Sequence, residues 1–306
     1  MDISVEKWVD THVHIGGTSE CGPSDIIAGL VEVFEKEEVE LRFIASPVSD
    51  WLRMVAENGD GILEAHRLLH QVVESLPDRV YGSCMVNPHF LDASLTSMDQ
   101  CFGEWGFVQL GELVTYLMNY RMNTKSMEKL VRKAVEYGVP IHVHISTSNA
   151  KPQGNFSSGE EELEDMLDLV ERVPEGKYIV AHGIGAPLIH PPVVDTYLDI
   201  IDRRYGQWPE NLWIEIMHFH AAGVSSALRY IPASKIMAGM DWSTGALPPY
   251  PLYGTIFGPA EKENPYPPSV ESLVNLLAEA GADGKMIKQI AYQNAFELYG
   301  LEDSEH

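Results

Sequence analysis

Cysteine is scarce in this 306-residue chain, which holds three residues at the distant positions Cys21, Cys84 and Cys101. An odd number of cysteines without any Cys-x-x-Cys pair argues against a disulfide framework and against a thiolate zinc site. Long apolar runs are missing as well, because no stretch of eighteen apolar residues occurs and the N-terminus has no signal-peptide pattern. We therefore expect a cytoplasmic protein that has no membrane as a partner.

Positive charge is also in short supply, since 21 lysines and arginines face 45 aspartates and glutamates, giving a net charge of −24. Such a surface repels a polyphosphate backbone, which argues against nucleic acid as a partner. Two phosphate-binding motifs are absent too. No Gly-x-Gly-x-x-Gly follows the first apolar run, and no Gly-x-x-x-x-Gly-Lys-Ser/Thr occurs anywhere, so dinucleotide and P-loop enzymes lose support.

Short β-type runs alternate with amphipathic helical stretches along the whole chain. Eight runs rich in Val, Ile and Phe predict strands at 7–14, 39–46, 80–86, 107–112, 140–145, 178–182, 212–217 and 235–240. Helical patterns between them include 25–37, 58–76, 126–137, 160–172 and 192–205. This alternation favours an α/β fold, a single (β/α)8 TIM barrel, over an open doubly wound sheet. We expect one domain over residues 1–306, with a long ordered loop at 247–268.

Histidines and carboxylates stand at the ends of five of the predicted strands, which is where the active site of such a barrel lies. These residues are His12, His14, Glu112, His142, His144, His182 and Asp241. Both imidazoles of a His-x-His pair share one face of a strand, because successive side chains alternate. His142 lies on the same face as His144 but one pleat farther from the strand end, so we expect His142 to be a hydrogen-bonded histidine of the core. Since imidazole and carboxylate are ligands of zinc and similar ions, the pattern predicts a divalent metal site.

This combination resembles the amidohydrolase superfamily, and within it the amidohydrolase-2 group of enzymes similar to aminocarboxymuconate semialdehyde decarboxylase. The motifs that carry the resemblance are Asp10-Thr11-His12-Val13-His14, Val86-Asn87-Pro88, Gly111-Glu112, the segment Gly138 to His144, Ala181-His182-Gly183-Ile184-Gly185, Gly239-Met240-Asp241-Trp242 and the closing segment Tyr292 to Gly300. In that group the histidine four residues after the strand-five proline binds metal, which assigns His144 rather than His142.

The resemblance implies a divalent metal, with zinc preferred, held by His12, His14, His144 and Asp241. His182 would lie beside the metal or among its ligands, and Glu112 could bridge to a second ion. One ion is preferred and two are left open. Asp241 is suited to accept a proton from the metal-activated water, and His182 to polarise a substrate carbonyl or stabilise an oxyanion.

Two reactions on a small-molecule substrate stay open. Hydrolysis of an amide, lactone or ester comes first, because a strand-four glutamate such as Glu112 is typical of hydrolytic relatives. The alternative is non-oxidative decarboxylation of a small unsaturated or aromatic acid, with Arg53 or Arg121 as candidates to bind the substrate carboxylate. A non-catalytic barrel is a third hypothesis, which the complete set of ligand types argues against. Such barrels often pair through their outer helices, so a homo-oligomer is also considered.

Further side chains are expected near the mouth of the barrel. His218 and His220 follow the seventh predicted strand. Aromatic residues in loops at the same end are Trp51, Tyr116, Tyr120, Trp242 and Tyr253. These rings either shape the substrate pocket or pack beneath the loops.

Overall fold

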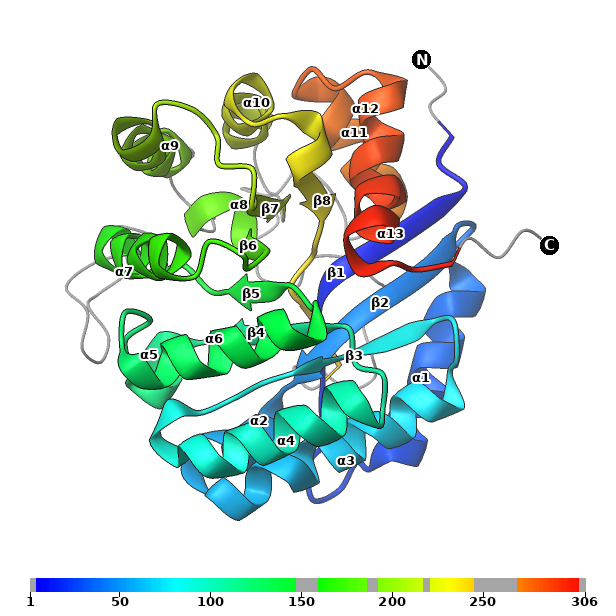
Figure 1. Ribbon diagram of the computed structural model, residues 1–306. Coiled ribbons are helices and arrows are strands. Elements are labelled where there is room, and N and C mark those ends of the chain that lie inside the picture. Colours follow the sequence, from blue (N-terminus) through cyan, green and yellow to red (C-terminus); the bar gives the residue numbers. More distant parts are fainter. Residues whose placement is uncertain (1–3, 147–158, 186–191, 217–220, 245–268, 303–306) are drawn as a thin grey trace.

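Parallel strands form the centre of the computed structural model, which describes residues 4–146, 159–185, 192–216, 221–244 and 269–302 (Figure 1). The strands are β1 (Lys7–Ile15), β2 (Glu40–Pro47), β3 (Val80–Cys84), β4 (Gln109–Leu113), β5 (Ile141–Val143), β6 (Tyr178–Val180), β7 (Leu212–Ile216), β8 (Ile236–Ala238) and β9 (Trp242–Ser243). The first eight coincide with the eight predicted runs. Most of their residues are buried on both faces, as in a parallel sheet covered by helices, which is why the runs read as continuously apolar.

Each strand from β1 to β8 pairs in parallel with the next one along the chain. β9 follows β8 after residues 239–241 and pairs in parallel with β1, where Val13 lies opposite Trp242. Thr11 Oγ1 donates a hydrogen bond to the carbonyl of Ala238 at 2.9 Å across the same seam. The segment 236–243 thus pairs with β7 through β8 and with β1 through β9, so it connects the last strand of the barrel to the first. This is the strand order of a (β/α)8 barrel, and the predicted fold is confirmed.

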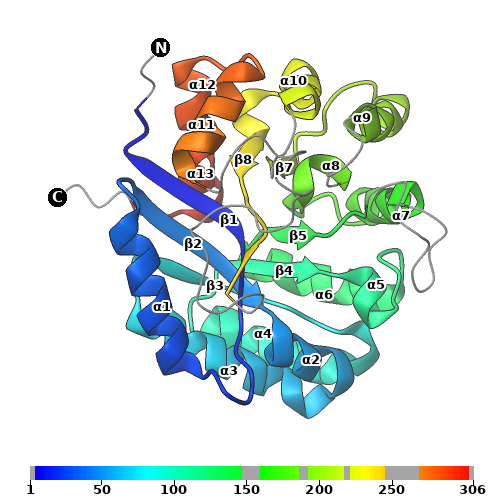
Figure 2. The ribbon, with the colours of Figure 1, turned by 180° about the vertical axis from the view of Figure 1, so that it is seen from behind.

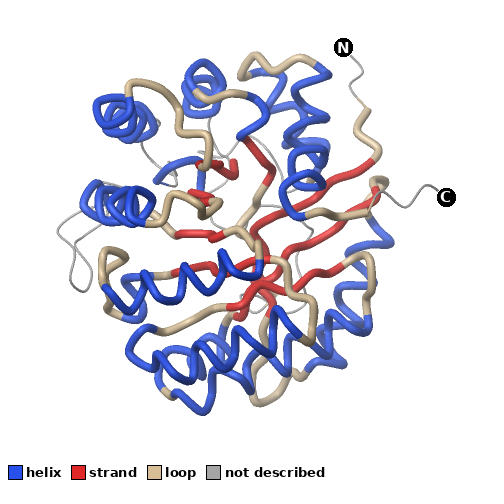
Figure 3. The backbone as a smooth tube through the Cα atoms, in the orientation of Figure 1, coloured by secondary structure: helices blue, strands red, loops and turns tan. Residues whose placement is uncertain are grey.

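Helices surround the strands on the outside, as Figures 2 and 3 show from opposite sides. They are α1 (Pro23–Lys36), α2 (Ser49–Glu57), α3 (Gly59–Ser75), α4 (Leu91–Gly103), α5 (Thr115–Met118), α6 (Lys125–Tyr137), α7 (Gly159–Arg172), α8 (His182–Gly185), α9 (Pro192–Tyr205), α10 (Ala221–Tyr230), α11 (Val270–Glu279), α12 (Gly284–Lys288) and α13 (Asn294–Tyr299), with the short turns η1 (Pro88–Phe90), η2 (Ala233–Lys235) and η3 (Gln289–Gln293). The five predicted helical stretches correspond to α1, α3, α6, α7 and α9.

Local sequence signals explain how such a helix begins and ends. At the start of α6 the side chain of Thr124 accepts a hydrogen bond from the backbone N–H of Met127 at 3.3 Å. The helix ends at Gly138, whose φ of 73° is a left-handed conformation that glycine adopts without strain. The short connection that follows leads directly into β5, whose end carries a predicted metal ligand.

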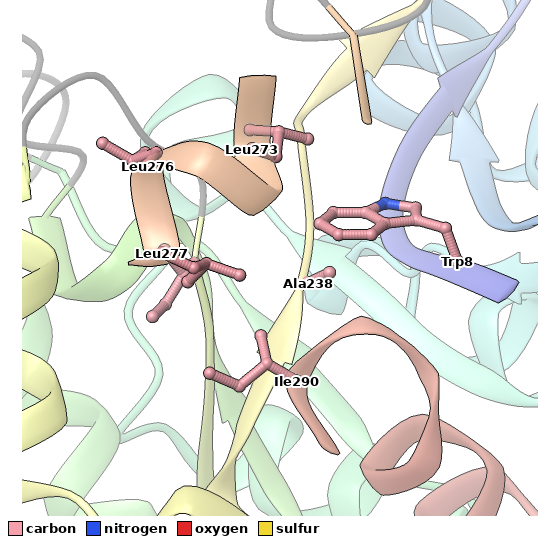
Figure 4. Close-up of a pocket in the computed structure, with 7 residues that line it drawn as sticks. Trp8, Ala238, Leu273, Leu276, Leu277 and Ile290 are labelled. Carbon is pink, nitrogen blue, oxygen red and sulfur yellow. The ribbon is translucent and has the colours of Figure 1, made fainter. Parts of the chain in front are cut away.

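An apolar seam joins the barrel to its C-terminal helices. Trp8 of β1 is 1% exposed and faces α11 across the outer surface of β8. Figure 4 shows a small pocket at this seam, lined by Trp8, Ala238, Leu273, Leu276, Leu277 and Ile290 among others. Burial of these side chains stabilises the junction between the amino end of β1, the outer surface of β8 and the C-terminal helices.

Among the helices of the described ranges, none combines the length and the hydropathy needed to cross a membrane. The predicted loop 247–268 lies outside the described residues, as do His218, His220 and Tyr253.

Candidate metal centre

Six side chains from five strand ends converge in the structure: His12 and His14 of β1, Glu112 of β4, His144 just after β5, His182 shortly after β6, and Asp241 between β8 and β9. They are the residues that the sequence pattern predicts for the site. Four of them are buried, whereas the side chains of His144 and Asp241 keep exposures of 17% and 16%. These two therefore lie on the side of the cluster that solvent reaches.

The tightest group consists of two imidazole nitrogens and two carboxylate oxygens. His12 Nε2 and His14 Nε2 lie 3.0 Å apart. Glu112 Oε2 is 3.4 Å from each of them, and Asp241 Oδ1 is 3.5 Å from His12 Nε2 and 2.9 Å from His14 Nε2. Ligand atoms around a tetrahedral ion with bonds of about 2.0–2.2 Å lie roughly 3.3–3.6 Å apart. Three of these five distances lie in that range and the other two are shorter, so the donor types and most of the spacing fit a divalent metal ion.

Glu112 also faces a second pair of histidines. Its Oε1 is 2.9 Å from His144 Nδ1 and 3.3 Å from His182 Nε2. Asp241 also contacts both histidine pairs. Its Oδ2 lies 3.5 Å from His182 Nε2, while its Oδ1 faces His14. The donor set thus falls into two neighbouring groups that share both carboxylates, an arrangement in which a carboxylate can bridge two ions.

Mutual charge dominates the protonation of the cluster. Burial alone would lower the pKa of His14, but hydrogen bonds to Asp241 and Glu112 outweigh it and raise the pKa to about 9. Burial opposes ionisation of Glu112, yet the positive charges of His12 and His144 hold the pKa of Glu112 well below its usual value. Burial also opposes ionisation of Asp241, but the charge of His12 and a hydrogen bond from His14 lower its pKa. In the metal-free centre, protons on the histidines neutralise the negative charge of the carboxylates. A divalent cation can take the place of these protons.

The Nδ1 atoms of His12 and His14, which point away from the carboxylates of the cluster, both have a polar partner. His12 Nδ1 lies 2.7 Å from Glu215 Oε1, and His14 Nδ1 lies 3.0 Å from the hydroxyl of Ser46. Such partners fix the orientation of a ligating imidazole and direct its other nitrogen at the metal. Neither partner is among the residues singled out from the sequence. The available signal for Glu215 is a single charge inside the apolar strand Leu212–Ile216.

His142 has a different environment from that of His144. It is 1% exposed, and its Nδ1 accepts a hydrogen bond from the amide nitrogen of Gln109 at 3.3 Å. Burial, together with the charge of His12, lowers its pKa to about 4, so the ring stays neutral. Its Nε2 lies 3.7 Å from Glu215 Oε1. These contacts place His142 in the interior of the barrel, while the assignment of His144 as the ligand stays a prediction.

The two candidate arginines bind carboxylates outside the centre. Arg53 is largely exposed and pairs with Asp50 at 3.2 Å. Arg121 Nη2 donates to Asp165 at 2.7 Å, and its Nη1 lies 2.8 Å from Glu161. Neither geometry supports a role in binding a substrate carboxylate.

The predicted mouth aromatics divide into two kinds. Trp51, Tyr120 and Trp242 are buried. Tyr116 is partly exposed, and its ring centroid lies 5.0 Å from that of His144. Among the rings of this set that the structure describes, Tyr116 is therefore the one that borders the solvent side of the cluster.

Comparison with known proteins gives one family match. The model of the family described as Amidohydrolase matches residues 9–301. A search of curated protein sequences found no match.

Solved structures with a similar fold come from several enzymes. A dihydroxybenzoic acid decarboxylase from Polaromonas sp. JS666, with bound manganese and 2-nitroresorcinol, is 13% identical, with a TM-score of 0.64 over 98% of this chain and 99% of that one. A 5-carboxyvanillate decarboxylase from Sphingomonas paucimobilis is 12% identical, with a TM-score of 0.65 over 97% and 100%. A 4-oxalomesaconate hydratase from Rhodopseudomonas palustris is 15% identical, with a TM-score of 0.63 over 96% and 95%. At these identities the similarity concerns the fold.

Proposed function

Because the chain belongs to the amidohydrolase family, we propose that its six-residue cluster is a metal centre that catalyses the non-oxidative decarboxylation of a small aromatic or unsaturated acid. One observation carries the proposal: Asp241 has one oxygen within the tightest donor group and the other beside His182. A carboxylate so placed can hold an ion and exchange a proton with a substrate. The names of the similar structures favour decarboxylation over the hydrolysis that the strand-four glutamate favours.

His12, His14, His144 and Asp241 would hold the ion, as expected from the sequence, with Glu112 between the His12/His14 pair and the His144/His182 pair. A bound divalent ion supplies Lewis acidity at a substrate carboxylate or neighbouring oxygen. Zinc stays our preferred ion, and manganese is the ion in three similar structures.

Asp241 is the residue we assign to proton transfer. Its lowered pKa leaves it ionised in the free site, so it must first accept a proton, which an acidic hydroxyl of the substrate can provide. The carbon that bears the carboxylate then takes the proton back from Asp241, with His182, 3.5 Å from Asp241, to orient the substrate oxygen. The bond from that carbon to its carboxylate breaks, CO2 leaves, and the electron pair of the broken bond restores the double bond of the product.

Hydrolysis is the second candidate, and the position of Glu112 favours it. The carboxylate lies between the His12/His14 pair and the His144/His182 pair, as a bridge between two ions would. Ionised Asp241 is equally suited to accept a proton from an attacking water.

A matched substrate panel separates the two reactions. We would incubate the metal-loaded protein with hydroxybenzoic and unsaturated acids and with their esters, amides and lactones, and measure CO2 and acid release. CO2 from the free acids that disappears in Asp241→Asn supports decarboxylation. Acid release from the esters or lactones without CO2 would replace it with hydrolysis. Four properties expected from the sequence stay predictions: zinc as the ion, one domain over residues 1–306, a cytoplasmic location and a homo-oligomer.

A further inference from the structure

A buried carboxylate on β7 connects two residues of the metal centre. Glu215 is fully buried, and its Oε1 lies 2.7 Å from His12 Nδ1 and 2.7 Å from the backbone nitrogen of His182. An ionised carboxylate only accepts hydrogen bonds, so His12 carries its proton on Nδ1. When His12 Nε2 gives up its own proton, its lone pair is therefore directed to the side that faces His14, Glu112 and Asp241.

The second bond of Glu215 acts on the backbone at the first residue of α8, just after β6. His182 has a φ of 62°, a left-handed conformation that residues other than glycine rarely adopt. Its N–H donates to Glu215, and its Nε2 faces Glu112 and Asp241 at 3.3 and 3.5 Å. One carboxylate oxygen thus fixes an imidazole from β1 and the first peptide N–H of α8.

The space around Glu215 is shaped for a carboxylate. A Cβ atom at Gly239 would lie 2.1 Å from Glu215 Oε2, so any larger residue at that position would displace the side chain. Gly239 directly precedes the segment that carries Asp241. The glycine therefore allows the carboxylate to reach both His12 and His182.

A polar chain supports Glu215 from inside the barrel. His142 Nε2 lies 3.7 Å from Glu215, and Gln109 donates to His142 Nδ1 at 3.3 Å. The hydroxyl of Tyr299, from the closing helix α13, donates to the amide oxygen of Gln109. Barrel interiors are usually filled with branched apolar residues, and polar groups there are costly to bury. A polar chain that ends at a candidate metal ligand is better explained by function than by packing.

We propose that Glu215 is a positioning residue of the metal centre, which fixes the tautomer and orientation of His12 and the backbone of His182 and thereby raises the affinity for a divalent ion. The proposal rests on the metal-dependent function and leaves the reaction type open. Removal of a partner that orients a ligating histidine typically weakens metal binding about 10–100-fold.

The test measures metal affinity directly. Metal-free protein would be titrated with Zn²⁺ and with Mn²⁺ against a competing chelator, in wild type, Glu215→Gln and Asp165→Asn. Asp165 is a matched control, because it is a buried carboxylate that binds Arg121 instead of a residue of the centre. We expect about 10–100-fold weaker binding in Glu215→Gln and unchanged binding in Asp165→Asn. Visible spectra of Co²⁺-loaded protein should change only in Glu215→Gln, and circular dichroism checks the fold of each variant.

Gly239→Ala gives an independent variant that leaves the glutamate in the sequence. It should weaken metal binding as Glu215→Gln does, and the double variant should lose little more, because both changes remove the same contact. Equal affinity of wild type and a folded Glu215→Gln would overturn the role of Glu215 and leave the metal centre standing. A wild-type protein that binds neither ion would overturn both proposals. Metal binding without decarboxylation would remove only the proposed reaction.

Discussion

Asp241 Oδ1 lies 2.9 Å from Nε2 of His14, which joins the carboxyl end of the last strand of the barrel to that of the first. The contact occurs because the segment 236–243 pairs with β1 through β9. The same aspartate turns its second oxygen to His182, and this dual position is the basis of its assigned role.

Replacement of Asp241 by asparagine tests that role. The amide keeps the size of the side chain but cannot accept the proton, so we expect a folded protein with turnover reduced about 100-fold or more. Steady-state rates at full metal loading measure the effect, with circular dichroism as the check on folding. Turnover close to that of wild type would exclude Asp241 as the group that carries the proton.

The two histidines of β5 and its end should behave differently when each is replaced by alanine. His144 has Nδ1 2.9 Å from Glu112, whereas His142 contacts Gln109 inside the barrel. We expect His144→Ala to lower metal content, and His142→Ala to keep it at saturating metal while it destabilises the core. Elemental analysis and thermal unfolding measure the two effects. The opposite pattern of metal content would move the ligand assignment to His142.

The fold and the six cluster residues could be predicted because they depend on patterns that are local in sequence. Each strand is a buried apolar run, and each of these residues stands where such a run ends, as His182 and Asp241 do. Glu215 could not be assigned in this way, because it lies within β7 and its partner His12 belongs to β1. Alternation along a strand gives two faces, but it does not tell which of them faces the interior of the barrel.

Glu112→Gln tests the number of ions. We expect about one ion per chain in wild type, and one ion bound more weakly in the variant, because a neutral amide replaces a carboxylate 3.4 Å from His12 and His14. Elemental analysis after gel filtration, together with chelator competition, gives stoichiometry and affinity. A fall from two ions to one would instead identify Glu112 as a bridge and strengthen the case for hydrolysis.

Metal affinity should depend on pH through His14. Its pKa of about 9 in the metal-free protein means that a proton occupies the ring below that pH. An imidazole must lose this proton to bind metal, so affinity should rise as the pH increases toward 9. Chelator competition with Zn²⁺ between about pH 6 and 9 measures the slope, and proton release on binding provides a second readout. A flat profile would contradict the protonated state that we assign to the free centre.

A final prediction concerns acid stability and a histidine outside the centre. His66 of α3 is fully buried, and its Nε2 accepts the backbone N–H of Met85 at 2.9 Å. Burial lowers its pKa from 6.5 to about 4. Between these two pH values the unfolded chain binds a proton that the folded chain does not. The contribution of His66 to stability is therefore complete above pH 6.5 and is lost as the pH falls toward 4, by about 3 kcal/mol in total.

His66→Gln separates this contribution from that of other groups. A glutamine oxygen can still accept the Met85 N–H but does not titrate in this range, so the unfolding free energy of the variant should fall less between pH 6.5 and 4. Urea unfolding at a series of pH values measures both slopes. His142, whose pKa is also lowered to about 4, keeps part of the acid sensitivity in the variant. Identical slopes in the two proteins would mean that His66 takes up a proton in the folded state, against the neutral ring that its bond to Met85 requires.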